Sequence, residues 1–253
     1  NRKSKLNSVS IIPIYAEMAD DENASIVTNP NSFDEEDTPA DPAINQQVYL
    51  WFTVIVLVIG FGGNILVLVA FGLYKKLRSL GSIFIVNTAA SDICVGVLGD
   101  LFIVVGIATG GDYLVNNEHL CVLSSYFCAA VCIVSVWSIA AAAFNGYVRV
   151  CHHQVYSKIY TPVSVGIMLI AIWATGILIL LPTLFGWGGH YYDPVLMFCI
   201  PSHTSSRSYT YFMVFTGWIC PLIVIVYSFA RIIMTVRTSS QNLKKEKTGA
   251  KGT

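Results

Sequence analysis

The residue with the strongest chemical signal is an aspartate inside an apolar stretch. Asp92 lies within residues 83–108, where a carboxylate in contact with hydrocarbon is unfavourable and is a functional candidate by default. Asn64 and Ser135 occur at similar depths in two other apolar stretches, so we expect the three side chains to form a polar cluster. The alternative is that Asp92 is a protonated, hydrogen-bonded packing residue.

Two cysteines are placed where a disulfide can form. Cys121 opens the third apolar stretch and Cys199 lies in the loop before the fifth, on the side that we expect to face the oxidising compartment. The sequence therefore predicts a Cys121–Cys199 bridge that holds this loop over the mouth of the bundle. Buried thiols usually behave as small hydrophobes, and four other cysteines fit that role: Cys94, Cys128, Cys132 and Cys220.

Catalytic and metal-binding patterns are absent from the sequence. The histidines lie in loops or at the edges of apolar stretches, and none belongs to an HExxH motif. With 15 basic and 15 acidic residues the formal net charge is zero, so no global basic field would attract nucleic acid. An enzyme, a metal centre and a nucleic-acid partner are therefore not expected.

The elements that hold these residues are predicted to be membrane-spanning helices. The chain has 253 residues, of which 55% are hydrophobic and 12% are charged, against about 25% charged in soluble domains. A helix rises about 1.5 Å per residue and must cross roughly 30 Å of hydrocarbon. The fold class is predicted to be an all-α, polytopic transmembrane helix bundle, with spans at about 48–74, 83–108, 121–147, 162–185 and 209–236.

The two ends of the chain differ in charge. Residues 1–45 are predicted to be a disordered acidic extracellular tail, residues 46–237 the bundle in the lipid bilayer, and residues 238–253 a basic cytoplasmic segment. Lys and Arg in the first and third loops favour the same orientation, which makes the protein a multi-pass plasma-membrane protein with its N-terminus outside. Asn23 begins an Asn-Ala-Ser glycosylation sequon, or a chance tripeptide.

Landmarks in order along the chain resemble those of the rhodopsin-like G-protein-coupled receptors. Asn145-Gly146-Tyr147 begins 24 residues after Cys121, the interval that this family places between its bridging Cys and its Asp-Arg-Tyr. The resemblance runs from about residue 63 to 237 and implies that five of seven expected spans are present. The other landmarks are Gly63-Asn64, Asn87-Thr88-Ala89-Ala90-Ser91-Asp92, Trp173 and Pro221.

Shorter strings are similar to those of melatonin receptors. Tyr192-Asp193-Pro194 ends five residues before Cys199 and resembles their second outer loop. Asn145 resembles the Asn that these receptors have in place of the usual Asp. Their second inner loop is resembled by Cys151-His152, Tyr156 and Tyr160-Thr161. An opsin-like receptor is the alternative, because Phe185-Gly186-Trp187-Gly188 resembles the opsin outer loop.

The resemblance implies a cell-surface receptor that passes a small-molecule signal to a heterotrimeric G protein, with a receptor oligomer as a further possibility. It implies a sodium ion near Asp92 and no other cofactor. Thr183 and Gly217 replace ligand-facing residues of melatonin receptors, which puts melatonin itself in doubt. The residues implied to line the ligand pocket are Cys128, Cys132, Thr183, Tyr191 and Gly217.

The residues implied to couple to a G protein depart from the family pattern. They are Asn145, Gly146, Tyr147 and Arg149, and Gly146 stands where the family has its Arg. Glycine supplies no guanidinium, so we expect weak coupling unless Arg149, one turn further on, substitutes for it. The chain would be a fragment or a truncated product, and two other functions stay open: a non-signalling truncated receptor partner and a small-molecule transporter, although no repeat typical of transporters is evident.

Overall fold

The computed structural model describes residues 42–249 of the chain. The predicted glycosylation site Asn23, with the rest of the tail up to residue 41, lies outside the described residues. Within them, five helical segments are long and apolar enough to cross a membrane, at Gln47–Leu73, Ser82–Thr109, Glu118–Cys151, Pro162–Phe185 and Arg207–Asn242. Each contains or overlaps a predicted span, so the prediction of a polytopic helix bundle is confirmed.

The spans are built from one or more helical elements each. The first is α1 (Pro42–Leu73), and the third is the single long helix α5 (Glu118–Cys151). The others are composite: α2 (Ser82–Val95), the π-helical turn η2 (Gly96–Asp100) and α3 (Leu101–Thr109); α7 (Pro162–Leu180) with the 3-10 turn η3 (Leu181–Phe185); and α8 (Arg207–Val214), the π-helical turn η4 (Phe215–Ile219) and α9 (Cys220–Gly249). The predicted basic segment is therefore helical as far as Gly249.

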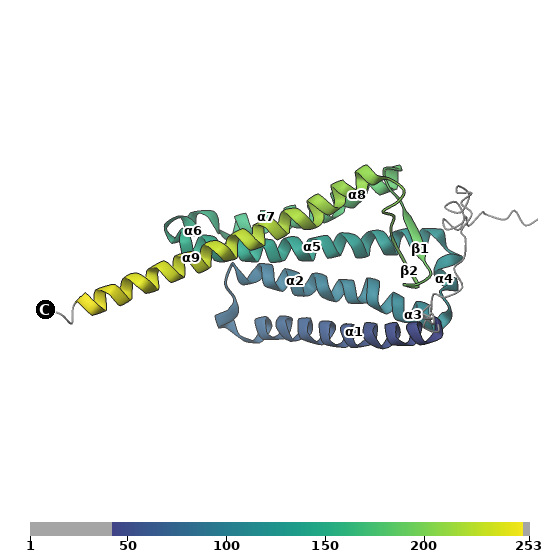
Figure 1. The fold of residues 1–253 in the computed structure, drawn as a ribbon, viewed down its shortest axis with the longest axis horizontal. Coiled ribbons are helices and arrows are strands. Elements are labelled where there is room, and N and C mark those ends of the chain that lie inside the picture. Colours follow the sequence, from purple (N-terminus) through teal and green to yellow (C-terminus); the bar gives the residue numbers. More distant parts are fainter. Residues whose placement is uncertain (1–41, 250–253) are drawn as a thin grey trace, which may run out of the picture. The chain divides into compact units, whose positions relative to one another are not determined.

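Short elements connect the spans. One end of the bundle carries η1 (Lys75–Leu77) and α6 (His153–Ile159), and we call it the basic end because Lys75, Lys76, Arg149 and Lys158 lie there. The other end carries α4 (Asp112–Val115) and a hairpin of β1 (His190–Asp193) and β2 (Phe198–Pro201), with Tyr192 opposite Cys199. We call it the hairpin end (Figure 1). The all-α prediction did not include this hairpin.

Side chains just before the helices explain where several of them begin. Asn117 accepts the backbone N–H of Leu120 at 3.1 Å and caps α5. Thr161 accepts the N–H of Ser164 at 3.2 Å, with a proline in the first turn of α7. Such caps satisfy backbone donors that have no partner within the helix, and proline fits the first helical position because it has no N–H to lose.

Helix α5 is the element on which the others pack. It contacts α2 on one side and α7 and α9 on others, as Figure 1 shows, and the hairpin covers one of its ends. Its buried side chains are mostly small, which lets the backbones of neighbouring helices approach closely. Such close packing holds helices together in lipid, where the hydrophobic effect between them is weak. The helix α1 instead packs against α2 and α3 and leaves most of its surface exposed.

The closest approach of α7 to α5 depends on a glycine. A Cβ atom added at Gly176 would lie 2.6 Å from the Val134 side chain and 2.7 Å from the Ala130 carbonyl oxygen. The same atom added at Gly166, on the same helix, would meet nothing within 4 Å. Gly176 therefore allows the contact between the two helices, whereas Gly166 faces open space.

These two glycines give a matched test of the packing. We predict that Gly176→Ala lowers the free energy of unfolding by about 1–3 kcal/mol, the usual effect of overpacking. Gly166→Ala should instead be neutral or raise it by up to about 1 kcal/mol, because alanine is the better helix former. Thermal unfolding of the two variants in detergent measures the difference, and equal shifts would contradict the proposed role of Gly176.

Candidate functional site

The predicted disulfide closes the hairpin end. Cys121 at the start of α5 is bonded to Cys199 of β2, with Cα atoms 5.3 Å apart, so this prediction is confirmed. Cys199 is fully buried and packs with Leu114 of α4 and Phe198 of β2. The bond closes a loop of 78 residues, for which loss of chain entropy in the unfolded state stabilises the fold by roughly 4–5 kcal/mol. The hairpin is thereby fixed to α5.

A cavity of about 240 Å³ lies beneath this hairpin. Two of the residues predicted to contact ligand, Cys128 and Cys132, line it from successive turns of α5. Among the described residues, no charged side chain lines the cavity. The other lining residues come from α5, β2 and the fifth span: Ser125, Ala129, Ile133, Phe198, Cys199, Ile200, Pro201, Met213 and Trp218.

The three other predicted ligand residues are not among those that line this cavity. A Cβ at Gly217 would lie 3.4 Å from the Ile133 side chain, so the glycine packs against a lining residue. Tyr191 is on β1, where its ring centroid is 6.2 Å from that of His203, away from the cavity wall. Thr183 of η3 is buried and bonds to a histidine, whose other ring nitrogen contacts the lining residue Ser125.

This histidine, His190 of β1, lies between two hydroxyls. Thr183 donates its own hydrogen to the Leu180 carbonyl at 2.7 Å, so its oxygen accepts from Nε2–H of His190 at 2.9 Å. Nδ1 then accepts from the hydroxyl of Ser125, 2.7 Å away on α5. The hydrogen bonds thus favour a neutral imidazole, and burial lowers the pKa of His190. Sequence reasoning missed this group, because a loop histidine and two distant hydroxyls carry no shared pattern.

The neutral His190 predicts a pH dependence of stability. The unfolded chain begins to bind a proton at this residue near pH 6.5, while the folded chain binds it only at lower pH. The free energy of unfolding should therefore fall as the pH drops from about 7.5 to about 5.5, a range that includes the ordinary histidine pKa. His190→Gln keeps a donor and an acceptor but cannot titrate, so its melting temperature should depend less on pH.

The exposed His119 provides the control for this measurement. Thermal unfolding of the His119→Gln variant should keep the pH dependence of the unmodified protein. If His190→Gln and His119→Gln show the same pH dependence, the hydroxyl-bound histidine is not responsible for it.

The predicted polar cluster forms in part. Ser135 of α5 donates to Oδ1 of Asp92 on α2 at 2.6 Å, and Ser135 is buried. Asn64 takes no part, which corrects the prediction: its amide donates to the Gly60 carbonyl of its own helix at 2.8 Å. The depth of a residue along a span can be counted from the sequence, but the direction in which it faces depends on helix rotation.

A second polar link joins three helices beside this pair. Asn87 of α2 donates to the hydroxyl of Ser138 on α5 at 2.7 Å, and the Trp173 indole of α7 donates to Oδ1 of Asn87 at 3.1 Å. Ser138 passes its own hydrogen to the Val134 carbonyl at 2.6 Å. Every polar group in this chain of contacts has a partner, as burial in a hydrocarbon environment requires.

At the basic end, the predicted coupling residues face in different directions. Asn145 is buried and donates to the Tyr156 hydroxyl of α6 at 3.3 Å. The hydroxyl of Tyr147 lies 2.8 Å from Nε2 of His152. Gly146 faces α9, where an added Cβ would lie 3.6 Å from Ile232.

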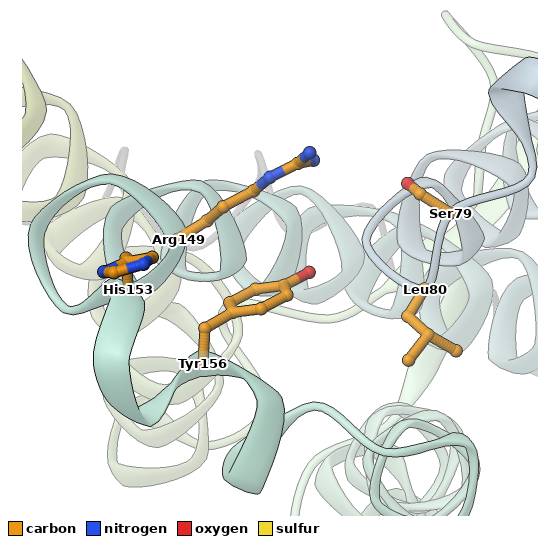
Figure 2. A pocket seen from close by; sticks show the side chains of 5 residues that line it. All are labelled: Ser79, Leu80, Arg149, His153 and Tyr156. Carbon is orange, nitrogen blue, oxygen red and sulfur yellow. The ribbon is translucent and has the colours of Figure 1, made fainter.

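Arg149 does not lie on the face of Gly146. It is exposed and lines a separate pocket with Ser79, Leu80, His153 and Tyr156, which Figure 2 shows from close by. The expectation that Arg149 takes the place of an arginine at position 146 therefore finds no support in its position. The two residues approach different elements, α9 in one case and the loops around α6 in the other.

Comparison with known proteins defines the class of this protein. Residues 63–252 match the family described as 7 transmembrane receptor (rhodopsin family), so the chain belongs to that family. Squid rhodopsin shares the fold, with a TM-score of 0.69 at 22% identity over 88% of this chain and 60% of that one.

The similar curated proteins are melatonin receptors. Melatonin receptor type 1C of Xenopus laevis is 34% identical over 189 residues, which cover 75% of this chain and 44% of the receptor. Melatonin receptor type 1B of Homo sapiens is 31% identical over 184 residues, which cover 73% of this chain and 50% of the receptor. The chain thus spans about half the length of the curated relatives that it matches, and the predicted resemblance to melatonin receptors is confirmed.

Proposed function

We propose that this chain is part of a cell-surface receptor that binds a small ligand at the hairpin end and passes the signal to a heterotrimeric G protein at the basic end. The observation that carries this proposal is the cavity beneath the disulfide-anchored hairpin, within a fold of the rhodopsin family. The family is one of receptors, which supports signalling rather than catalysis. The proposed orientation places the hairpin end outside the cell, in agreement with the basic loops at the opposite end.

The cavity favours a neutral, largely apolar ligand. Its walls combine thiols, a thioether and aromatic rings, and the polar groups nearest to them are hydroxyls. A cationic amine would need a carboxylate partner in the cavity wall, and the residues that line the cavity include none. Melatonin, named in the relatives, is a neutral molecule of this kind and is the first ligand to test, although Thr183 and Gly217 change the surroundings of the cavity.

Coupling to the G protein is proposed to be weak because of Gly146. A guanidinium at this position would supply a planar fork of donors for a carboxylate or carbonyl group of the partner. Gly146 supplies no side chain on the face that looks toward Ile232 of α9, and Arg149 faces elsewhere. The same feature favours a second candidate function, a non-signalling partner that associates with another receptor of the family.

We predict that Gly146→Arg raises ligand-driven guanine-nucleotide exchange several-fold in the full-length receptor. The added Cβ meets Ile232 at an ordinary contact distance, so the substitution should be accommodated. Exchange by a purified G protein measures the effect, with Arg149→Ala as the control. Strong exchange by the unmodified receptor that Gly146→Arg leaves unchanged would contradict the proposal, and no exchange by either form would favour the non-signalling partner.

A sodium ion is proposed beside Asp92. The Asp92–Ser135 pair lies at mid-span between α2 and α5, and its carboxylate and hydroxyl oxygens are ligands suited to a hard cation. Such an ion would offset the unfavourable position of a half-buried carboxylate within a span. Asn64, which bonds to its own helix, is not included in this proposed site.

The sodium proposal predicts that Asp92→Asn removes the sodium dependence of ligand affinity. Asparagine keeps the size of the side chain but loses the charge that attracts the ion. Binding of a labelled ligand to the full-length receptor is measured in two buffers, one with a sodium salt and one with the salt of a large organic cation. If the unmodified receptor depends on sodium and Asp92→Asn depends on it equally, Asp92 is a packing residue only.

A further inference from the structure

The pocket at the basic end gathers polar side chains from three parts of the chain. Ser79 and Leu80 belong to the loop before α2, Arg149 to the last turn of α5, and His153 and Tyr156 to α6. The pocket has a volume of about 490 Å³. Figure 2 shows the hydroxyls of Ser79 and Tyr156 directed toward the space between them, with the Arg149 side chain along one side.

The hydrogen-bond partners leave donors available in this pocket. The oxygen of Tyr156 accepts from the Asn145 amide at 3.3 Å, so its own hydrogen is free to donate. The hydroxyl of Ser79 accepts the backbone N–H of Ser82 at 3.2 Å and also shares a hydrogen bond of 2.7 Å with the Ser82 hydroxyl, in which either oxygen can donate. Arg149 has no hydrogen bond or ion pair within the described part of the chain. Arg149, Tyr156 and the His153 ring therefore present N–H and O–H donors to one space.

The segments that form the pocket supply no negative charge to balance Arg149. Residues 74–91 and 119–192, which include every residue that lines the pocket, contain no Asp or Glu. The neighbouring Arg78 is used differently, because its guanidinium donates to the carbonyls of Phe71 and Gly72 at the end of α1. A bound anion would therefore give Arg149 a counter-charge that these segments lack.

We propose that this pocket binds a phosphomonoester, supplied by the headgroup of an anionic lipid or by a free phosphate compound. A phosphomonoester carries close to two negative charges at neutral pH and three acceptor oxygens, which suit the planar fork of Arg149 and the hydroxyl donor of Tyr156 beside it. The volume lies in the range of small-molecule sites, about 300–1,000 Å³. Basic pockets between helices at the cytoplasmic face bind such headgroups, so the lipid source rests on the proposed orientation.

An acidic segment of a protein partner is the competing occupant. The geometry favours the phosphate, because the pocket is a small space between two loops rather than an extended groove. It is also distinct from the face of α5 that carries Gly146 and looks toward α9, where the proposed G-protein contact lies. The phosphomonoester would hold the loop before α2 against α6, which together line the pocket.

The test measures binding by the full-length protein in phosphatidylcholine nanodiscs, without receptor ligand or G protein. Phosphatidylinositol phosphate in the disc should raise the melting temperature, and phosphatidylserine at equal charge should raise it less. Soluble inositol phosphate forms the second arm and a glutamate-rich peptide the third. Both faces of a nanodisc are accessible, so the result does not depend on the orientation in cells or on signalling.

Three variants separate the pocket from general electrostatics. Arg149→Gln should weaken binding of the phosphoinositide about tenfold or more, as loss of a charge-assisted hydrogen bond does. Tyr156→Phe, which removes one donor and keeps the ring, should weaken it less. Arg237→Gln removes an equal charge from the exposed surface of α9, outside the pocket, and should change binding little.

The outcomes decide both the site and its source. A larger response to the lipid than to soluble inositol phosphate assigns the phosphate to the membrane, and an equal response to both assigns it to a free compound. Binding that survives Arg149→Gln, or that falls equally in Arg237→Gln, overturns the proposal. A response to the acidic peptide alone also overturns it and assigns Arg149 to a protein partner.

Discussion

The packing of α5 against neighbours on several sides is the interaction on which the other sites depend. A helix in lipid gains little from burying apolar side chains, so close approach of backbones and shared polar contacts hold the bundle together. The small residues of α5, including Ala140 and Ala143, allow this approach, and Gly176 provides it from α7. A change in the rotation of α5 would displace every site described above.

The sites succeed one another along this helix. At the hairpin end Cys121 anchors β2, and Cys128 and Cys132 follow at the cavity wall. Ser135 then holds the carboxylate of α2 at mid-span, and Arg149 lies in the pocket at the basic end. A single helix therefore carries two lining residues of the cavity, the hydrogen-bond partner of the Asp92 carboxylate and the arginine of the pocket at the basic end.

Much of the fold could be predicted from the sequence because hydrocarbon imposes a simple rule. Each span must be long, apolar and helical, so the uncharged runs indicate the helices directly. The Cys121–Cys199 bridge followed from two cysteines at one end of the spans. Asn64 was misplaced because depth does not fix the direction of a side chain, and His190 was missed because its partners Ser125 and Thr183 meet only after the loop folds back.

The central claim is that the hairpin end faces outside and the basic end faces the cytoplasm, since ligand access, G-protein contact and the source of the phosphate all require it. Two variants with one added cysteine test it in cells, Val195→Cys in the hairpin and Lys158→Cys on α6, both at exposed positions. Each is made in a background in which the five free cysteines Cys94, Cys128, Cys132, Cys151 and Cys220 are replaced by Ser and the Cys121–Cys199 bond is kept. A membrane-impermeant maleimide should label position 195 in intact cells and position 158 only after permeabilisation. Labelling of position 158 in intact cells, with position 195 protected, would contradict the account.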